Sequence, residues 1–289
     1  MHLFPASRAA ARPGRGLSRR RLLAATVAVA GSSVFARRFA AAAVSHDLTL
    51  GLQLFSLRKF PVADALVHAK ELGFDAVEFY PGMLPVNATP ETIADILRQV
   101  AELGLQISAH GVNRFTGDAA ANRRIFEFAK AAGIGILTAD PDPDSFESLD
   151  ELVREFDIRV AIHNHGPRHR YNKAADVLHA IEGHDVRIGA CADLGHYIRS
   201  GERPVDVIRL LAGRLYGIHL KDFAEMEDKS HGVILGQGHV DVPAVFAALE
   251  QAGFPSDGAL SLEYEANPDD PFDDIRQCVE VARAALAAT

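Results

Sequence analysis

The sequence predicts an α/β protein that folds as a single (β/α)8 TIM barrel. From residue 48 onward, short apolar runs rich in β-forming residues alternate with longer segments of helical periodicity, and eight such pairs follow one another. The 246 residues that follow an N-terminal segment of 43 match the usual length of such a barrel, about 250 residues. An open doubly wound sheet is the alternative, but no Gly-x-Gly-x-x-Gly motif follows the first strand, where a dinucleotide site would lie.

Each expected strand is a short run of aliphatic, β-branched or aromatic residues between glycine, proline or polar turn residues. The runs fall near residues 49–54, 75–79, 105–109, 134–138, 158–163, 187–193, 215–220 and 259–264. Because a helical segment separates each run from the next, consecutive strands are expected to run parallel. Eight repeated units favour closure into a barrel.

The segments between the strands repeat apolar residues every three or four positions, which is the period of an amphipathic helix. Helices are expected near residues 61–72, 90–103, 119–132, 145–156, 172–182, 203–212, 243–252 and 271–287. Several end in a glycine just before the next strand, as at Gly73, Gly104, Gly133 and Gly253, and a glycine there fits a left-handed helix C-cap.

The N-terminal segment predicts export. Residues 18–23, Ser-Arg-Arg-Arg-Leu-Leu, precede an apolar run that ends at Phe35, and small residues at 40–43 offer a cleavage site, the order found in a twin-arginine signal. The apolar run of about 15 residues is shorter than the roughly 20 that a spanning helix needs. We therefore expect residues 1–43 to be a signal peptide and residues 44–289 to form the barrel. The mature protein would be periplasmic or otherwise exported, with no stable membrane insertion.

The charge of the barrel excludes nucleic acid as an expected partner. Residues 1–43 hold eight of the 30 basic residues and none of the 38 acidic ones, so the remainder has 22 against 38 and a formal net charge of −16. Such a surface repels phosphate backbones. The two cysteines, Cys191 and Cys278, are too few for a disulfide framework and are expected in the core.

Four expected strands end on residues that bind divalent metals or move protons. These side chains are His163 and His165 on the fifth strand, Asp193 and His196 on the sixth, His219 and Lys221 on the seventh, and Glu263 on the eighth. Because the carboxyl ends of parallel strands meet at one face of a barrel, the sequence predicts a site there. The longest loop, residues 221–242, contains His231 and His239 and is expected to cover the mouth of the barrel.

Glu263 is the strongest single candidate, because a carboxylate deep in a strand is costly unless it is paired or bound to metal. Glu78 on the second strand is a second inward carboxylate, for which a salt bridge is as good an interpretation as catalysis. His110 adds an imidazole after the third strand. Taken singly, each residue also has a structural interpretation, as a helix cap, a hydrogen-bonded core histidine or a surface ion pair. Polar residues at corresponding positions of five strands are hard to explain by chance.

The order of these motifs resembles the xylose-isomerase-like barrel superfamily, which holds sugar isomerases and epimerases and also the apurinic endonucleases related to endonuclease four. The motifs are Asp193-Leu194-Gly195-His196, Ile218-His219-Leu220-Lys221-Asp222, residues 236–241 and Ser261-Leu262-Glu263. In the ketose epimerases of this group, one divalent ion is typically held by Glu, Asp, His and Glu of strands five to eight. The resemblance implies one ion of manganese, cobalt, zinc or magnesium, with Asp193, His219 and Glu263 as ligands.

The fifth strand departs from that pattern, because His163 stands where the first Glu is expected. The resemblance then implies a metal held by His163, Asp193, His219 and Glu263, with one of the two opposed carboxylate bases missing. A three-zinc phosphoesterase is disfavoured, since the fourth strand lacks the expected His and the surface is acidic.

The expected function is that of a metal-dependent isomerase or epimerase acting on a small sugar or keto-sugar through an enediolate. The groups expected to move protons are Glu263, His163, His165 and Glu78, and those expected to hold substrate oxygens are His196, Lys221 and His110. A keto-sugar lyase or hydratase on the same barrel is the alternative, since it passes through the same enolate. A non-catalytic sugar-binding barrel is another. A homo-oligomer is left open.

Overall fold

The computed structural model describes residues 48–288 of the 289-residue chain. The signal peptide expected at residues 1–43, with the boundary at residue 44, lies outside the described residues. Within residues 48–288, no helix combines the length and the apolar character needed to cross a membrane.

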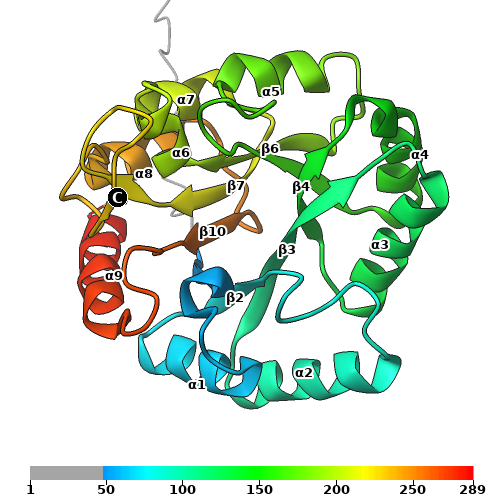
Figure 1. Cartoon of the computed structure of the whole chain (residues 1–289), viewed down its shortest axis with the longest axis horizontal. Helices are drawn as coiled ribbons and strands as arrows, with labels where there is room; N and C mark the ends of the chain where they lie inside the picture. The colour runs from blue at the N-terminus through cyan, green and yellow to red at the C-terminus, as the bar shows by residue number, and fades with distance from the viewer. Residues whose placement is uncertain (1–47, 289) are drawn as a thin grey trace, which may run out of the picture. The chain divides into compact units, whose positions relative to one another are not determined.

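The predicted (β/α)8 barrel is confirmed. Within the described residues, eight parallel strands close in the order β1-β10-β7-β6-β5-β4-β3-β2, and helices surround them (Figure 1). The barrel strands are β1 (Leu50–Gln53), β2 (Ala76–Phe79), β3 (Gln106–Phe115), β4 (Ile136–Pro141), β5 (Arg159–His163), β6 (Ile188–Asp193), β7 (Leu215–Leu220) and β10 (Ala259–Leu262). Pairing of β1 with both β2 and β10 closes the ring.

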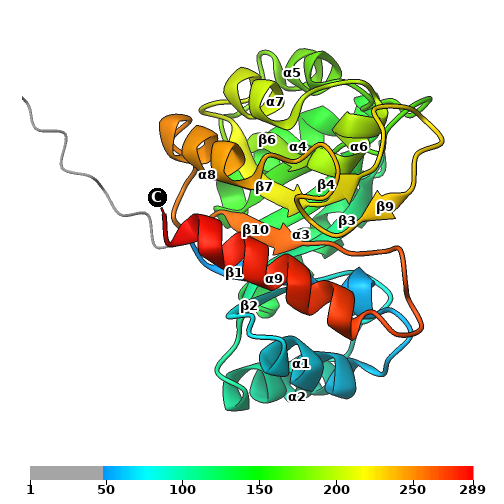
Figure 2. The same ribbon diagram turned by 90° about the vertical axis from the view of Figure 1, so that its left-hand side faces the viewer.

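The helices pack outside the strands, and Figure 2 shows α9 running along the outer face of the barrel. They are α1 (Val62–Glu71), α2 (Pro90–Glu102), α3 (Ala119–Ala131), α4 (Phe146–Phe156), α5 (Ala174–Ile181), α6 (Leu194–Arg199), α7 (Pro204–Leu210), α8 (Val242–Gln251) and α9 (Phe272–Leu286), with 3-10 turns at Leu54–Leu57 and Pro143–Ser145. Glycines Gly73, Gly104, Gly133 and Gly253 after α1, α2, α3 and α8 have positive φ angles, as the C-cap pattern predicts.

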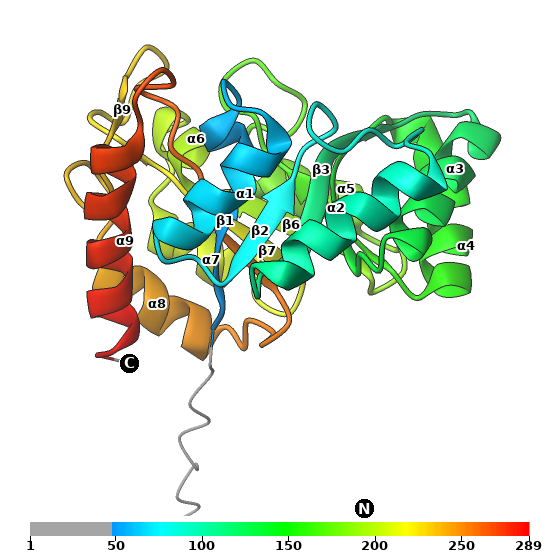
Figure 3. The same cartoon turned by 90° about the horizontal axis from the view of Figure 1, so that it is seen from below.

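Two elements were not expected from the sequence, and both lie at the rim of the barrel. The short helix α6 begins directly after β6, where the Asp193 carboxylate accepts a hydrogen bond from the His196 amide at 2.7 Å. A six-residue helix is too short for periodicity to reveal it. The second element is an antiparallel hairpin of β8 (Asp222–Phe223) and β9 (Gly232–Val233). Figure 3 shows β9 and α6 toward the same upper edge of the barrel.

The buried side chains inside the barrel change from apolar to polar along its axis. A small cluster of buried residues, among them Ala109, Ile136, Ala161 and Ala259, surrounds the thiol of Cys191. Toward the carboxyl ends of the strands the buried side chains are polar, and include Glu78, Thr138, His219 and Ser261. The second cysteine, Cys278, is buried in the main hydrophobic core on α9, and both thiols are free. The polar layer forms the floor beneath the candidate site.

Candidate active site

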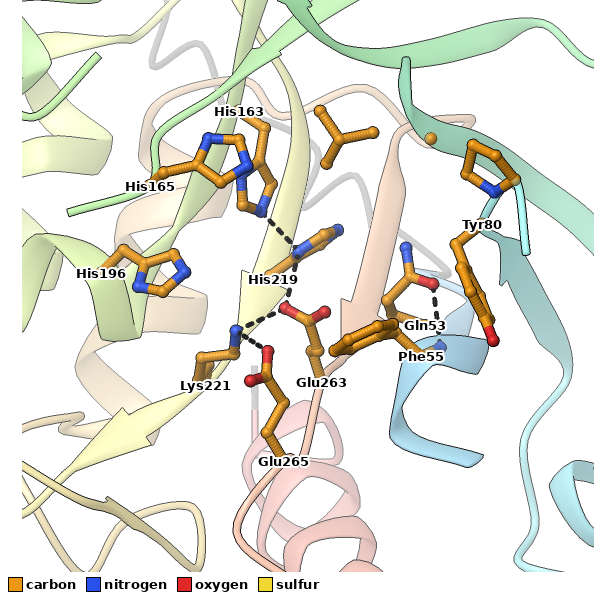
Figure 4. Close-up of a pocket in the computed structure, with 13 residues that line it drawn as sticks. Gln53, Phe55, Tyr80, His163, His165, His196, His219, Lys221, Glu263 and Glu265 are labelled. Atoms are coloured by element: carbon orange, nitrogen blue, oxygen red, sulfur yellow. Dashed lines mark hydrogen bonds and ion pairs between the residues drawn. The ribbon is translucent and has the colours of Figure 1, made fainter. Parts of the chain in front are cut away.

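A cavity of about 300 Å³ opens at the carboxyl ends of the strands, where ligand sites lie in this architecture. Its walls combine aromatic side chains with a group of imidazoles, carboxylates and one ammonium (Figure 4). The lining residues are Gln53, Phe55, Tyr80, Pro81, Gly111, Val112, His163, His165, His196, His219, Lys221, Glu263 and Glu265. They come from β1, β3, β5, β7 and α6, from the 3-10 turn at Leu54–Leu57 and from the residues that follow β2, β5, β7 and β10.

Four buried residues at the floor of the cavity form one cluster of ligand atoms. His163, Asp193, His219 and Glu263 each offer one atom, and these atoms all lie within 4.8 Å of one another. His219 Nδ1 is 3.1 Å from His163 Nε2 and 3.2 Å from Glu263 Oε2. Metal bonds of about 2.0–2.2 Å put ligand atoms roughly 3–4 Å apart, so the spacing suits a shared cation.

The chemistry of the cluster also fits a divalent cation. Asp193 Oδ2 and Glu263 Oε2 are buried, and within residues 48–288 they face the Lys221 ammonium, at 3.0 and 2.6 Å, and the imidazoles of the cluster. Because buried carboxylates need positive partners, two carboxylate oxygens that converge with two imidazole nitrogens form a site that suits a cation. Imidazole and carboxylate groups are both ordinary ligands of divalent metal ions. The cluster can therefore hold one divalent cation.

The ammonium group of Lys221 lies at the edge of this cluster. Its Nζ is 3.0 Å from Asp193 Oδ2 and 2.6 Å from Glu263 Oε2, and it donates a hydrogen bond of 2.7 Å to Glu265 Oε1. Burial lowers the pKa of Lys221, but Asp193, Glu263 and Glu265 outweigh that effect and raise it well above its ordinary value. Lys221 is thus a fixed positive charge paired with the carboxylate oxygens of Asp193 and Glu263.

The two carboxylates of the cluster are held ionised. Burial raises the pKa of each, but neighbouring basic side chains outweigh it, chiefly His196 and Lys221 for Asp193 and Lys221 and His219 for Glu263. Both pKa values therefore lie below the ordinary range of a carboxyl group. Of the two, Glu263 lines the cavity and Asp193 does not. Glu263 is the carboxylate of the cluster that a ligand can reach.

Glu78 lies beneath His219 and does not line the cavity. Its Oε2 is 3.1 Å from His219 Nε2 and accepts a hydrogen bond of 2.7 Å from Ser261, and its Oε1 accepts one of 3.0 Å from Thr138. This carboxylate fixes the imidazole so that Nδ1 faces the cluster, the arrangement that carboxylates give to metal-bound histidines. The proton-moving role predicted for Glu78 is corrected to a positioning role, because the strand buries it one layer below the cavity.

The substrate contact predicted for His110 is also corrected. His110 is fully buried, its Nε2 lies 2.8 Å from the Leu84 carbonyl oxygen, and its ring packs at 4.9 Å against Phe128 of α3. The pairing of β3 with β4 is irregular between His110 and Asn113, which breaks the simple alternation of sides. The residues of β3 that reach the cavity are instead Gly111 and Val112.

The end of β5 follows strand alternation as the sequence predicts. The rings of His163 and His165 lie 4.6 Å apart on the cavity side, while Asn164 faces away and exchanges two hydrogen bonds with the backbone of Asp193, at 2.8 and 3.0 Å. Burial lowers the pKa of His165 to about 2 and that of His196 to about 3. Both imidazoles are neutral at ordinary pH and line the cavity as hydrogen-bonding groups.

Several lining residues were missed by sequence reasoning. Gln53 ends β1, so the strand-end argument applied to it as well, but amides carry no metal or proton signal. Its Oε1 accepts a hydrogen bond of 3.2 Å from the Phe55 amide. Phe55 lies in the 3-10 turn after β1 and Tyr80 directly after β2, and their rings pack edge to face at 5.3 Å; no sequence pattern marks either residue. Glu265, with 41% of its side chain exposed, lines the cavity and forms an ion pair with Lys221.

The long loop after β7 stands beside the mouth of the barrel. None of residues 222–242, all of which the structure describes, lines the central cavity, so His231 and His239 do not reach it. The buried Asp222 carboxylate accepts hydrogen bonds from the amides of Phe223, Gly236, Gly238, His239 and Val240 and fixes the base of the loop. Asp228 pairs with Arg168 and Arg199. The loop that was expected to cover the mouth of the barrel is therefore a hairpin anchored at the rim, and it does not line the central cavity.

Comparison with known proteins gives both a family and structural neighbours. The model of the xylose isomerase-like TIM barrel matches residues 66–285. The inosose dehydratase of Lacticaseibacillus casei is 28% identical over 138 residues, which are 42% of this chain and 45% of that protein, so the match spans less than half of the relative.

The solved structures cover more of the chain. A protein of Parabacteroides distasonis superposes with a TM-score of 0.64 at 27% identity, over 82% of this chain and 99% of that one. The 3-keto-D-glucoside 4-epimerase of E. coli gives 0.65 at 17% identity over 82% and 99%, a likeness of fold alone.

Proposed function

We propose that this chain, which belongs to the xylose isomerase-like TIM barrel family, is an enzyme that removes the proton beside the carbonyl of a keto-sugar and expels a neighbouring hydroxyl group as water. One observation carries the proposal. The buried cluster of His163, Asp193, His219 and Glu263 offers the cavity a single carboxylate, that of Glu263. One acid-base group suffices for an elimination, whereas an epimerisation moves protons on two faces of the substrate.

A divalent cation held by the cluster would supply a Lewis acid that polarises the substrate carbonyl. The chain's own residues do the rest. The ionised Glu263 takes the α-proton, and the electron pair of the broken C–H bond moves onto the carbonyl oxygen. The ammonium of Lys221, 2.6 Å from Glu263, stabilises negative charge that develops beside it.

The elimination is completed by the return of the proton. The carbonyl re-forms, and the electron pair of the enolate C=C bond makes the new C=C bond between the α and β carbons. The C–O bond to the β-hydroxyl breaks. The departing oxygen takes the proton from Glu263 and leaves as water. His165 and His196 are neutral at the pH of the reaction, since burial lowers both pKa values, and can donate a hydrogen bond to sugar hydroxyls without repelling a cation. The partial match to inosose dehydratase supports this outcome.

An isomerase or epimerase is the second candidate. His165 and His196 line the same cavity as Glu263, and either neutral imidazole has a lone pair that can accept a second proton. In that case the proton returns to carbon, and no water is lost. The two reactions share the first step and differ in their products.

Export of the folded enzyme by the twin-arginine route stays a proposal from the sequence. Such export would allow the metal to be loaded in the cytoplasm before translocation. Fractionation of cells that express the whole chain tests it, because substitution of Arg19 and Arg20 by Lys should retain the protein inside the cell.

The test is incubation of the purified protein with inosose and a panel of sugars and keto-sugars in heavy water, followed by mass spectrometry. We expect loss of water from a keto-sugar, deuterium at a carbon beside its carbonyl and about one divalent metal per chain. Glu263→Gln should slow the reaction by roughly 10²–10⁴-fold. Glu280→Gln, an exposed change on α9, is the matched control.

Each result has a definite meaning. Deuterium without water loss favours the isomerase or epimerase. Absence of both metal and exchange would leave a sugar-binding barrel without catalysis. Equal exchange rates in Glu263→Gln and the wild type would disprove the role of Glu263.

A further inference from the structure

A second cavity of about 220 Å³ lies beside the central one. One wall is the β8–β9 hairpin, with residues 230–233, and the other is the segment after β10, with residues 263–266. We refer to it as the hairpin cavity. Residues 230–233 take no part in the metal cluster, and the proposed reaction does not use them.

The two cavities share a wall. Lys221, Glu263 and Glu265 line both of them. The ion pair between Lys221 and Glu265 therefore separates the two spaces, and Glu265 is partly exposed. A ligand whose reacting carbon lies near Glu263 is one side chain away from the hairpin cavity. The arrangement suits a ligand that extends from one cavity into the other.

The walls of the hairpin cavity offer groups that recognise a sugar ring. Ser230 and His231 supply a hydroxyl and an imidazole, and Phe223 supplies an aromatic face. The Ser230 Oγ accepts a hydrogen bond of 2.7 Å from the Glu225 amide, so its own hydrogen is available to donate outward. The Phe223 ring also lies 6.5 Å from the ring of His196, which lines the central cavity. The hairpin cavity thus extends the central site with one hydrogen-bonding wall and one aromatic wall.

Size favours a ligand larger than one ring. Pockets for small molecules occupy roughly 300–1,000 Å³, so the central cavity of about 300 Å³ lies at the lower limit on its own. We infer that the hairpin cavity is a second subsite, which holds the second sugar ring of a keto-glycoside while its keto-sugar ring reacts in the central cavity. The inference rests on the proposed function and names the substrate class as two-ring keto-glycosides.

Gly232 allows the subsite to be filled selectively. A Cβ atom at Gly232 would lie 3.7 Å from Ala266 Cβ and 3.8 Å from the Asp222 carbonyl oxygen, both ordinary contacts. A Cβ atom is therefore tolerated at Gly232 and lies beside Ala266, which lines the same cavity. Gly232→Leu fills the space from the hairpin, and Ala266→Leu fills it from the opposite, exposed wall. Ala284→Leu on the exposed face of α9 is the matched control.

The experiment compares the 4-keto derivatives of glucose and of trehalose, because removal of the C3 proton beside the C4 carbonyl can expel the C2 hydroxyl as water in both compounds. Calorimetry with and without added Mn²⁺ measures binding, and water loss or deuterium uptake measures kcat/KM. We expect the wild type to prefer the two-ring compound by at least about tenfold in either measurement, a typical difference for one well-filled subsite. Gly232→Leu and Ala266→Leu should each remove most of this preference, and Ala284→Leu should keep it.

Equal binding of the two compounds by the wild type would overturn the subsite, as would a preference that survives both filling variants. The binding measurement separates this inference from the proposed function. A different outcome is that neither compound reacts, while the wild type still binds the two-ring compound more tightly than the one-ring compound and the filling variants do not. In that case the subsite stands and the proposed reaction fails. If only the one-ring compound reacts, and neither filling variant changes the binding of the two-ring compound, the reaction stands and the subsite fails.

Discussion

Strands β5 to β7 and strands β2 to β3 carry similar polar residues at their carboxyl ends, but the structure uses them differently. On β5 and β7, His163, His165 and His219 lie in the cavity wall. On β2 and β3, Glu78 lies beneath the cavity and His110 faces the helix layer. The same residue types thus form the cluster on one side of the barrel and its support on the other.

For His110 the difference follows from the regularity of the strands, whereas Glu78 faces the barrel interior and lies one layer below the cavity. The end of β5 pairs in register with β6 and alternates sides, so every second residue reaches the cavity. β3 changes register relative to β2 between Val77 and Glu78 and relative to β4 between His110 and Asn113. Bulges turn a side chain away from the face that simple alternation gives it. β6 and β7 also change register, between Ala190 and Cys191, but pair regularly from there to Asp193 and His219, so strand-end reasoning holds where no shift lies beside the residue concerned.

The first way to challenge this comparison is Asn164→Ala, which should have the largest effect. It removes the two hydrogen bonds that tie the end of β5 to the backbone of Asp193 and leaves two buried backbone groups unpaired. We expect the free energy of unfolding to fall by about 2–3 kcal/mol. Denaturant titration measures it, with the exposed Asn87→Ala as control. A loss no greater than that of the control would show that this link does not hold the site together.

Glu78→Gln tests the supporting side and should have an intermediate effect. The amide keeps the size of the side chain but removes the charge that orients His219. Metal affinity should fall by about 10–100-fold, as for other partners of metal-bound histidines. Competition with a chelator measures the affinity, and the exposed Glu250→Gln is the control. Unchanged affinity, together with a loss of kcat alone, would return Glu78 to the catalytic role expected from the sequence.

His110→Leu should have the smallest effect. The change leaves the Leu84 carbonyl oxygen without its imidazole partner, which costs about 1 kcal/mol of stability. Neither metal affinity nor KM should change, because His110 does not line the cavity. Thermal unfolding and substrate titration are the measurements, with His179→Leu on the exposed face of α5 as control. A raised KM without loss of stability would restore the substrate contact first predicted for His110.

The sequence predicted more of the site than of the walls around it. His163, Asp193, His219 and Glu263 were found because metal-binding side chains at strand ends are conspicuous against apolar runs. Phe55 and Tyr80 carry no such signal, because aromatic residues are more often packing residues. The hairpin after β7 escaped detection because its strands have two residues each.

By itself, the sequence determined the eight-fold repeat, the parallel sheet and the strands that end in chemistry-bearing residues, because periodicity is a local property of some ten residues. Only the tertiary structure decided that residues 163, 193, 219 and 263 share one cluster, that Lys221 stands beside it and that Glu78 supports it from below. It also decided that His110 faces away and that a second cavity adjoins the first. These outcomes depend on ring closure and on strand register between segments far apart in the chain, and no local pattern records either.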